Sequence, residues 1–113
     1  MHEFSLATEV INLVQREAQK RNAPVVNEIT IEVGSLSGVE AGAFESALKL
    51  LSEGSIIENA CLNILRINGI GLCNACSIEF EMMQRMESCP VCHAFPSEIN
   101  GGNEFRIVSM TID

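Results

Sequence analysis

The first third of the chain contains two regular hydrophobic patterns that have different periods. Over residues 5–21, apolar side chains recur at helical spacing, which predicts an amphipathic helix with one buried face. Ser5 is a suitable N-cap, and Asn22, followed by Pro24, would end the helix. Residues 28–33 then alternate strictly between polar and apolar, which predicts a half-buried strand. The buried face of the helix is expected to consist of Leu6, Val10, Ile11, Val14 and Ala18.

The middle and the end of the chain predict one more helix and two more strands. A helix is expected over residues 40–52, where apolar residues return at helical spacing and Gly54 lies where it can close the last turn. The apolar segments Cys61–Ile67 and Phe105–Ile112 suit strands. The alternation of the last strand slips between Ile107 and Val108, so a β-bulge is expected there to keep both halves facing the core.

Four cysteines form two Cys-x-x-Cys pairs, Cys73/Cys76 and Cys89/Cys92, with twelve residues between the pairs. Two such turns facing each other place four thiolates at the corners of a tetrahedron, the arrangement that structural Zn²⁺ prefers. Pro90 inside the second pair favours a rigid turn. We therefore expect these four residues to bind zinc, while a rubredoxin-like iron site would use the same thiolates.

Other uses of the cysteines fit the sequence less well. Two disulfides would need an oxidising compartment, and the N-terminus has none of the features of a secretory signal. A thioredoxin-like redox pair would leave the second pair unexplained. The fifth cysteine, Cys61, lies in an apolar run and is expected to be a small buried hydrophobe.

Glycine-rich segments at residues 68–71 and 100–103 flank the cysteine region. Such segments break regular structure, so flexible connections are expected at both. The simplest organisation is an α+β fold in which two helices pack on a small three-stranded sheet, with an inserted zinc-ribbon-like module. The base domain would comprise residues 1–69 and 103–113, and the zinc-binding module residues 70–102. Because about thirty residues cannot build a stable core alone, metal ligation would supply much of the module's folding free energy.

Charge and motif content exclude several functional classes. The net charge is −8 at pH 7, so nucleic acid is not an expected partner, because phosphate backbones repel such a surface. No apolar run approaches the ~20 residues that span a bilayer, and we expect a cytoplasmic protein without membrane association. The chain contains no His-Glu-x-x-His, Walker or Gly-x-Ser-x-Gly motif. A four-cysteine zinc site also has no open position for substrate, so no enzymatic activity and no catalytic residue are expected.

The second candidate metal site is at His2. Its imidazole lies beside the α-amino group of Met1, and the amide nitrogen between them can close two adjoining chelate rings. Planar nitrogen donors of this kind favour Ni²⁺ or Cu²⁺ over Zn²⁺, and the amide or carboxylate of Glu3 could complete the set. From the residues alone, His2 could also be no more than an exposed terminal residue. His93, directly after Cys92, could be solvated or could act as a pH-responsive alternative ligand.

Taken together, these features resemble the HypA/HybF family of nickel chaperones for [NiFe]-hydrogenase maturation. The resemblance runs along the whole chain and rests on four segments. The combination of the N-terminal tripeptide with the twelve-residue gap between the cysteine pairs is specific, whereas either feature alone would not be. The four segments are Met1-His2-Glu3 with Ser5, residues 33–39, the two cysteine pairs with the Cys-Pro-Val-Cys-His run at 89–93, and residues 102–107.

The resemblance implies a nickel metallochaperone, with Met1, His2 and Glu3 binding Ni(II) as transported cargo and the four cysteines holding structural Zn(II). It also implies the maturation GTPase HypB as a partner and the hydrogenase large-subunit precursor as the final acceptor. Some members of the family also supply urease, so urease maturation factors are further candidate partners. The alternative functions are a zinc-ribbon adaptor that binds only proteins, and a thiol redox switch.

Overall fold

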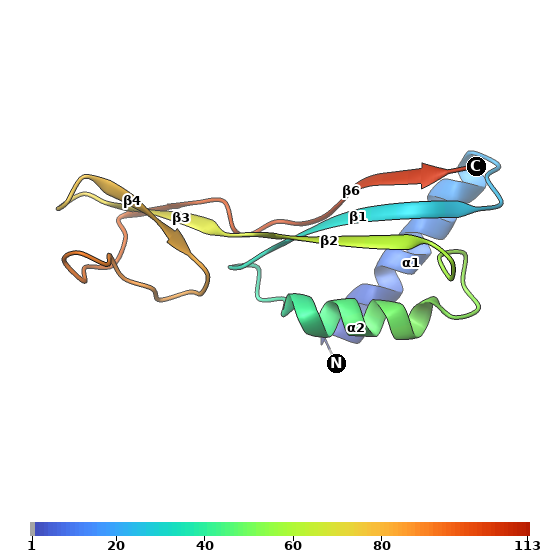
Figure 1. Cartoon of the computed structure of the whole chain (residues 1–113), viewed down its shortest axis with the longest axis horizontal. Helices are drawn as coiled ribbons and strands as arrows, with labels where there is room; N and C mark the ends of the chain where they lie inside the picture. Colours follow the sequence, from blue (N-terminus) through green and yellow to red (C-terminus); the bar gives the residue numbers. More distant parts are fainter. Residues whose placement is uncertain (1) are drawn as a thin grey trace.

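A computed structural model describes residues 2–113 and contains two helices and two three-stranded sheets (Figure 1). In the first sheet, β1 (Val26–Gly34) lies between β2 (Cys61–Ile67) and β6 (Phe105–Ile112). The helices α1 (His2–Lys20) and α2 (Ala41–Ser52) both cover one face of this sheet. We call these five elements the base. The predicted α+β fold, with two helices on a three-stranded sheet, is confirmed.

The core of the base follows the hydrophobic pattern closely. Four of the five predicted positions on α1 are buried, and Leu6 is partly buried against the same core. Ile29, Ile31 and Val33 of the central strand are 0–2% exposed. Phe44 of α2 completes the core and packs edge-on against Phe105 of β6, with ring centroids 5.0 Å apart.

The start of the first helix differs from the prediction. Helix α1 begins at His2, so Ser5 lies inside the helix and is not its N-cap. Glu3 occupies the first turn, where a carboxylate is favoured by the partial positive charge of the helix N-terminus. The end was predicted correctly, because Asn22 adopts a left-handed conformation (φ 54°) directly after the last turn. The metal-binding candidates His2 and Glu3 are therefore helical residues.

The predicted bulge in the last strand is confirmed. Ile107 of β6 pairs with Ile31, whereas Ser109 pairs with the preceding residue of β1, Thr30. Val108 is therefore left without a partner in the register. The extra residue lets Ile107 and Met110 both pack against the core while Val108 is exposed.

The expectation that Cys61 is buried is wrong. Cys61 is the first residue of β2, an edge strand of the base, and it is exposed. The neighbouring residue Leu62 packs against the core instead, because adjacent side chains on a strand point to opposite faces. The Cys61 thiol lies beside the polar side chain of Asn63, with Sγ 3.8 Å from Oδ1.

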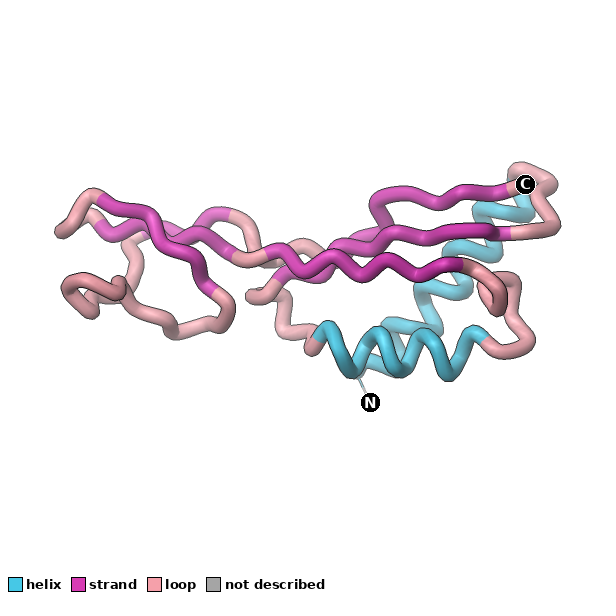
Figure 2. Tube along the Cα trace, viewed as in Figure 1, coloured by secondary structure: helices cyan, strands magenta, loops and turns pink. Residues whose placement is uncertain are grey.

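The second sheet holds the cysteines and follows directly from the first. Strand β3 (Gly69–Cys73) lies between β4 (Ile78–Met82) and β5 (Glu98–Asn100), and both neighbours run antiparallel to it. We call residues 69–100 the cysteine module. Only Asn68 separates β2 from β3, so the chain passes almost straight from one sheet into the other (Figure 2). The molecule is accordingly elongated, with principal extents of 55 × 26 × 17 Å.

The glycine-rich segments serve close packing at the junction between base and module. We expected flexible connections there, but Gly69 and Gly71 belong to β3. A methyl group on Gly102 would lie 2.7 Å from the Cα atom of Gly69, and one on Gly34 would lie 2.1 Å from the Gly102 carbonyl oxygen. Both distances are shorter than any carbon contact can be, so these positions require glycine. We call this close crossing of three backbone segments the neck.

One loop links the neck to the base. It comprises residues 35–40 and joins β1 to α2. The hydroxyl of Ser35 donates to the Met82 carbonyl (2.8 Å) and accepts from the Gly69 backbone N–H (3.3 Å), so the loop is bonded to both β3 and β4.

Neither helix is long and apolar enough to cross a membrane.

Candidate metal centres

The two Cys-x-x-Cys pairs fold into turns with the same backbone feature. Cys73 ends β3 and Cys76 lies in the turn that leads into β4. The residue directly after each pair has a left-handed backbone, with φ 56° at Ser77 and 66° at His93. In the second turn, the His93 N–H donates to the Cys89 carbonyl (2.9 Å). These reversals turn both cysteines of each pair toward the other pair.

The four cysteine sulfur atoms meet at one end of the molecule. All four Sγ atoms lie within 4.8 Å of one another, and those of Cys73 and Cys92 are 3.5 Å apart. Sulfurs at the corners of a zinc tetrahedron lie about 3.8 Å apart, because Zn–S bonds are about 2.3 Å long. The sulfurs form no disulfide, and their spacing fits a Cys₄ zinc site. Within residues 2–113, this cluster contains no histidine.

The surroundings of the cysteines shift the pKa values of Cys89 and Cys76 in opposite directions. The backbone N–H of Cys92, and to a smaller degree that of Val91, lowers the pKa of Cys89 to about 7 despite burial. A hydrogen bond with the Cys92 thiol, together with burial, raises the pKa of Cys76 to about 12. The lowered pKa of Cys89 favours its thiolate, which is the form of cysteine that binds a metal ion.

The completed cluster has a structural role. Four thiolates fill the tetrahedral positions of zinc and leave none for water or a substrate. Cys73 and Cys89 are buried, Cys76 is partly buried and Cys92 is exposed. A metal ion held by all four sulfurs would join the β3–β4 hairpin to the second cysteine turn.

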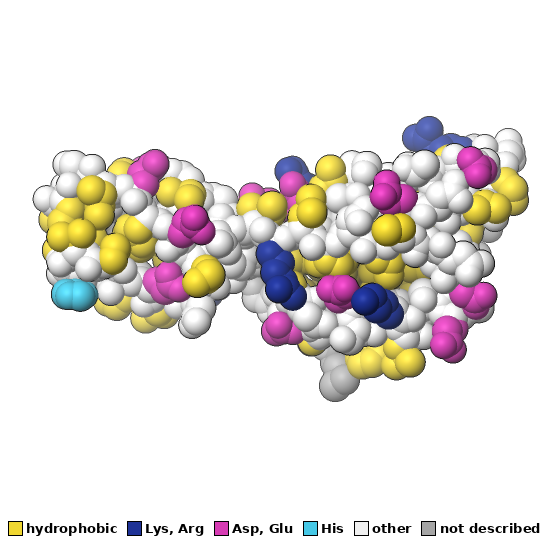
Figure 3. Space-filling view, in the orientation of Figure 1, with side chains coloured by type: hydrophobic (Ala, Val, Ile, Leu, Met, Phe, Trp, Pro, Cys, Tyr) yellow, Lys and Arg dark blue, Asp and Glu magenta, His cyan; other side chains and the backbone are white. Residues whose placement is uncertain are grey.

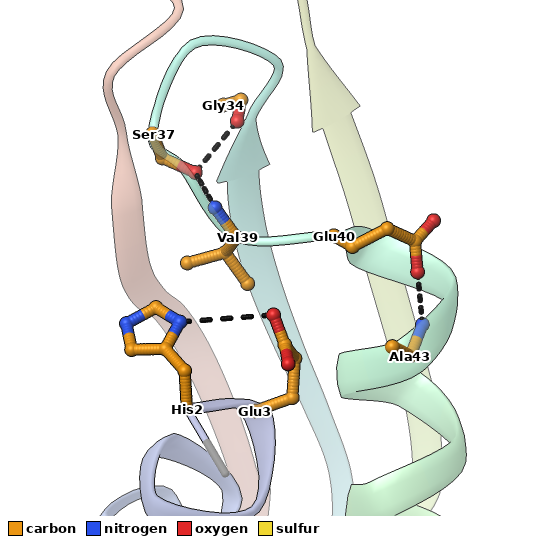
Figure 4. A network of polar contacts seen from close by, with 7 residues as sticks. All are labelled: His2, Glu3, Gly34, Ser37, Val39, Glu40 and Ala43. Carbon is orange, nitrogen blue, oxygen red and sulfur yellow. Dashed lines mark hydrogen bonds and ion pairs between the residues drawn. The ribbon is translucent and has the colours of Figure 1, made fainter.

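The second candidate site lies in the base. Figure 4 shows the side chains of His2 and Glu3 extending from the first turn of α1 toward Val39, with His2 Nδ1 3.6 Å from a Glu3 carboxylate oxygen. The His2 side chain is 60% exposed and that of Glu3 is 25% exposed. The third predicted ligand, Met1, lies outside the described residues. The two candidate sites lie in different parts of the fold, because His2 and Glu3 belong to the base and the four cysteines to the cysteine module (Figure 1).

Backbone donors hold the Glu3 carboxylate in its ionised form. Its own backbone N–H is the largest cause of a pKa below the usual range, and the N–H of Glu40 and the His2 imidazole lower it further. Glu40 is the N-cap of α2, where its carboxylate accepts from the Ala43 N–H. The contact with Glu40 was not foreseen from the sequence, because it depends on how the two helix N-termini meet.

A turn fixes the loop that faces His2 and Glu3. The hydroxyl of Ser37 donates to the Gly34 carbonyl (2.7 Å) and accepts from the Val39 N–H (3.2 Å) (Figure 4). The loop thus contacts Glu3 near its end, through Glu40, and the cysteine module near its start, through Ser35.

Comparisons with known proteins agree with this arrangement. The sequence model of the HypA family, described as "Hydrogenase/urease nickel incorporation, metallochaperone", matches residues 1–112. Hydrogenase maturation factor HypA of Parabacteroides distasonis is 38% identical over 112 residues, covering 99% of this chain and 97% of the relative. HypA 2 of Bradyrhizobium diazoefficiens is 34% identical over 113 residues, covering all of both chains.

A solved structure has the same fold along its length. The solution structure of the Ni metallochaperone HypA from Helicobacter pylori superposes with a TM-score of 0.64 at 27% identity, covering 97% of this chain and 96% of that protein. The fold, the Cys₄ cluster and the whole-length sequence match all point to one assignment. The chain belongs to the HypA family of nickel metallochaperones for hydrogenase maturation.

Proposed function

We propose that this protein binds Ni(II) at its N-terminus and delivers it during [NiFe]-hydrogenase maturation. The observation that carries the proposal is the pairing of an exposed imidazole with an ionised carboxylate at the start of α1, 3.6 Å apart. Cis ligands of an ion with bonds of about 2.1 Å lie about 3 Å apart. His2 and Glu3 thus need to approach by only about half an ångström to share one ion.

The helix N-terminus supplies the remaining donors. The first amides of a helix have no intrahelical acceptor, so the amide nitrogen of His2 can exchange a proton for nickel, while the N–H of Glu3 faces its own carboxylate. The helix dipole opposes a cation at this end, and negative donors offset that cost. The donor set would be the Met1 amine, the His2 amide and imidazole, and the amide or carboxylate of Glu3. Such binding releases protons and weakens as pH falls, which suits cargo that has to leave again.

The work is divided between the two parts of the chain in this proposal. Residues 1–69 and 103–113 carry the nickel site, and residues 70–102 form a module held by zinc on Cys73, Cys76, Cys89 and Cys92. The protein acts without turnover of its own, in the cytoplasm, and exchanges nickel with the GTPase HypB. The hydrogenase large-subunit precursor is the acceptor, and the family description leaves room for urease maturation as well.

Calorimetric Ni²⁺ titration of the zinc-loaded protein tests the proposed site. His2→Ala is expected to remove the tight nickel site, whereas His93→Ala, the matched control at the only other histidine, is expected to bind one equivalent as wild type does. Equal binding by all three proteins would reject the N-terminal site and favour an adaptor that handles no nickel. Loss in His93→Ala alone would move the site to the cysteine module.

A further inference from the structure

The side chain of Ser37 connects the neck to the part of the loop that faces the proposed nickel site. Its hydroxyl donates to the Gly34 carbonyl (2.7 Å) and accepts from the Val39 N–H (3.2 Å). The Ser37 N–H donates to the same carbonyl (3.1 Å). Gly34 has little room to move, because it lies in the close backbone crossing of the neck. Ser37 therefore fixes the position of Val39 relative to the sheet.

Val39 in turn lies beside the two candidate nickel ligands that the structure describes. In Figure 4 the side chains of His2 and Glu3 extend toward it. The backbone N–H of the next residue, Glu40, faces the Glu3 carboxylate. That N–H belongs to the planar peptide group that joins Glu40 to Val39. Any displacement of Val39 would therefore move the donor that holds the carboxylate.

We infer that Ser37 is a positioning residue for nickel binding. Its hydroxyl holds the peptide group between Val39 and Glu40 in place, and that peptide group orients the Glu3 carboxylate beside His2. Groups that orient a metal ligand contribute to affinity, because the ligand then loses less freedom on binding. Ser37 acts through Glu3 and is not itself a ligand. The inference rests on the proposed function, since it concerns the affinity of the same N-terminal site.

A second serine makes the same hydrogen bonds beyond the other end of α2. The hydroxyl of Ser55 donates to the Ser52 carbonyl (2.7 Å) and accepts from the Ile57 N–H (3.2 Å). The distances and the spacings along the chain equal those at Ser37. Helix α2 has 12 residues and is therefore about 18 Å long, with Glu40 as its N-cap and Ser55 beyond its C-terminus. Ser55→Ala is thus a matched control that leaves the loop facing Glu3 unchanged.

Calorimetric Ni²⁺ titration of zinc-loaded wild type, Ser37→Ala, Ser37→Thr, Ser55→Ala and His2→Ala tests the inference. Ser37→Ala is expected to bind nickel about tenfold more weakly, which is the lower end of what such supporting groups contribute. Ser37→Thr keeps the hydroxyl and should bind nickel as wild type does, and so should Ser55→Ala. Hydrogen exchange of the nickel-free proteins, measured by NMR, is the second readout. The Val39 amide should exchange faster in Ser37→Ala, and the Ile57 amide in Ser55→Ala.

Three results would overturn the inference: wild-type nickel affinity in Ser37→Ala, an equal loss in Ser55→Ala, or no recovery in Ser37→Thr. His2→Ala separates these results from failure of the proposed function, because undiminished nickel binding by His2→Ala would reject the N-terminal site itself. Zinc content is measured on every variant. Figure 3 shows the base and the cysteine module as two lobes with a narrow connection, so unchanged zinc indicates an intact module. Loss of zinc together with nickel in Ser37→Ala would also overturn the inference, since the hydroxyl would then support the whole molecule.

Discussion

Removing the metal from the cysteine cluster is expected to unfold the cysteine module and leave the base folded. The perturbation is a strong chelator applied to zinc-loaded protein, or Cys89→Ser at a buried ligand. The two parts differ in what holds them together. Every member of the buried core cluster lies in the base, between Ala7 and Ile57. The buried apolar residues of the module are Cys73, Met82 and Cys89, and two of these are candidate ligands.

Zinc ligation contributes more to the stability of the module than apolar burial does. Burying Met82 contributes about 1.5–3 kcal/mol, whereas zinc on four cysteines contributes on the order of 10 kcal/mol or more near neutral pH. The contribution of metal ligation is therefore several times larger than that of Met82, the one fully buried side chain of the module other than cysteine. Without it, the hairpin and the second cysteine turn have little to hold them together. The base loses none of its own core contacts.

Hydrogen exchange measured by mass spectrometry resolves the two parts. On chelation, amides of β3, β4 and β5 should lose protection, while those of β1 and α1 keep it. Cys61→Ser is the matched control, because Cys61 is exposed and far from the cluster in the fold, and its exchange pattern should equal that of wild type. Continued protection of β3 and β4 without metal would refute the reasoning, as would simultaneous unfolding of the base.

Three further predictions follow from packing and exposure. In zinc-loaded protein a thiol reagent should label Cys61 alone, and after chelation it should label all five cysteines. Labelling of the four clustered cysteines while zinc is present would support a redox switch instead. Phe44→Ala should lower the free energy of unfolding by about 4 kcal/mol, because Phe44 is fully buried and packs against Phe105. Urea titration measures this loss, and a loss below about 1 kcal/mol would show that Phe44 is not in the core. Gly34→Ala should disrupt the neck and raise hydrogen exchange in β3, whereas Gly54→Ala, where no atom lies within 4 Å, should leave β3 unchanged.

Sequence periodicity was sufficient for the base because its elements are amphipathic. The slip between Ile107 and Val108 predicted the bulge, since only an extra residue lets both halves of β6 reach the core. The spacing of the four cysteines predicted their clustering for a similar reason: the chemistry of one ion fixes their geometry.

The features that the sequence did not predict depend on contacts between distant segments. Cys61 lies in an apolar run of the sequence, which led us to expect that it is buried. Whether a side chain of the edge strand β2 is buried depends on which face of the sheet the helices cover, and Cys61 is exposed. Gly69 and Gly102 looked like flexible connections, whereas their role comes from a backbone crossing between residues more than thirty positions apart. The contact between Glu3 and the Glu40 N–H likewise requires the N-termini of α1 and α2 to meet in space.

The central claim is that the cargo nickel binds at the N-terminus and not at the cysteine cluster. One measurement tests it most directly: Ni²⁺ titration of zinc-loaded protein with its native N-terminus, compared with the same protein extended by Gly-Ser before Met1. The extension removes the Met1 amine from the donor set and leaves the cysteines and His93 unchanged. The extended protein is expected to keep its zinc and to lose the tight nickel site. Undiminished nickel binding by the extended protein would contradict it.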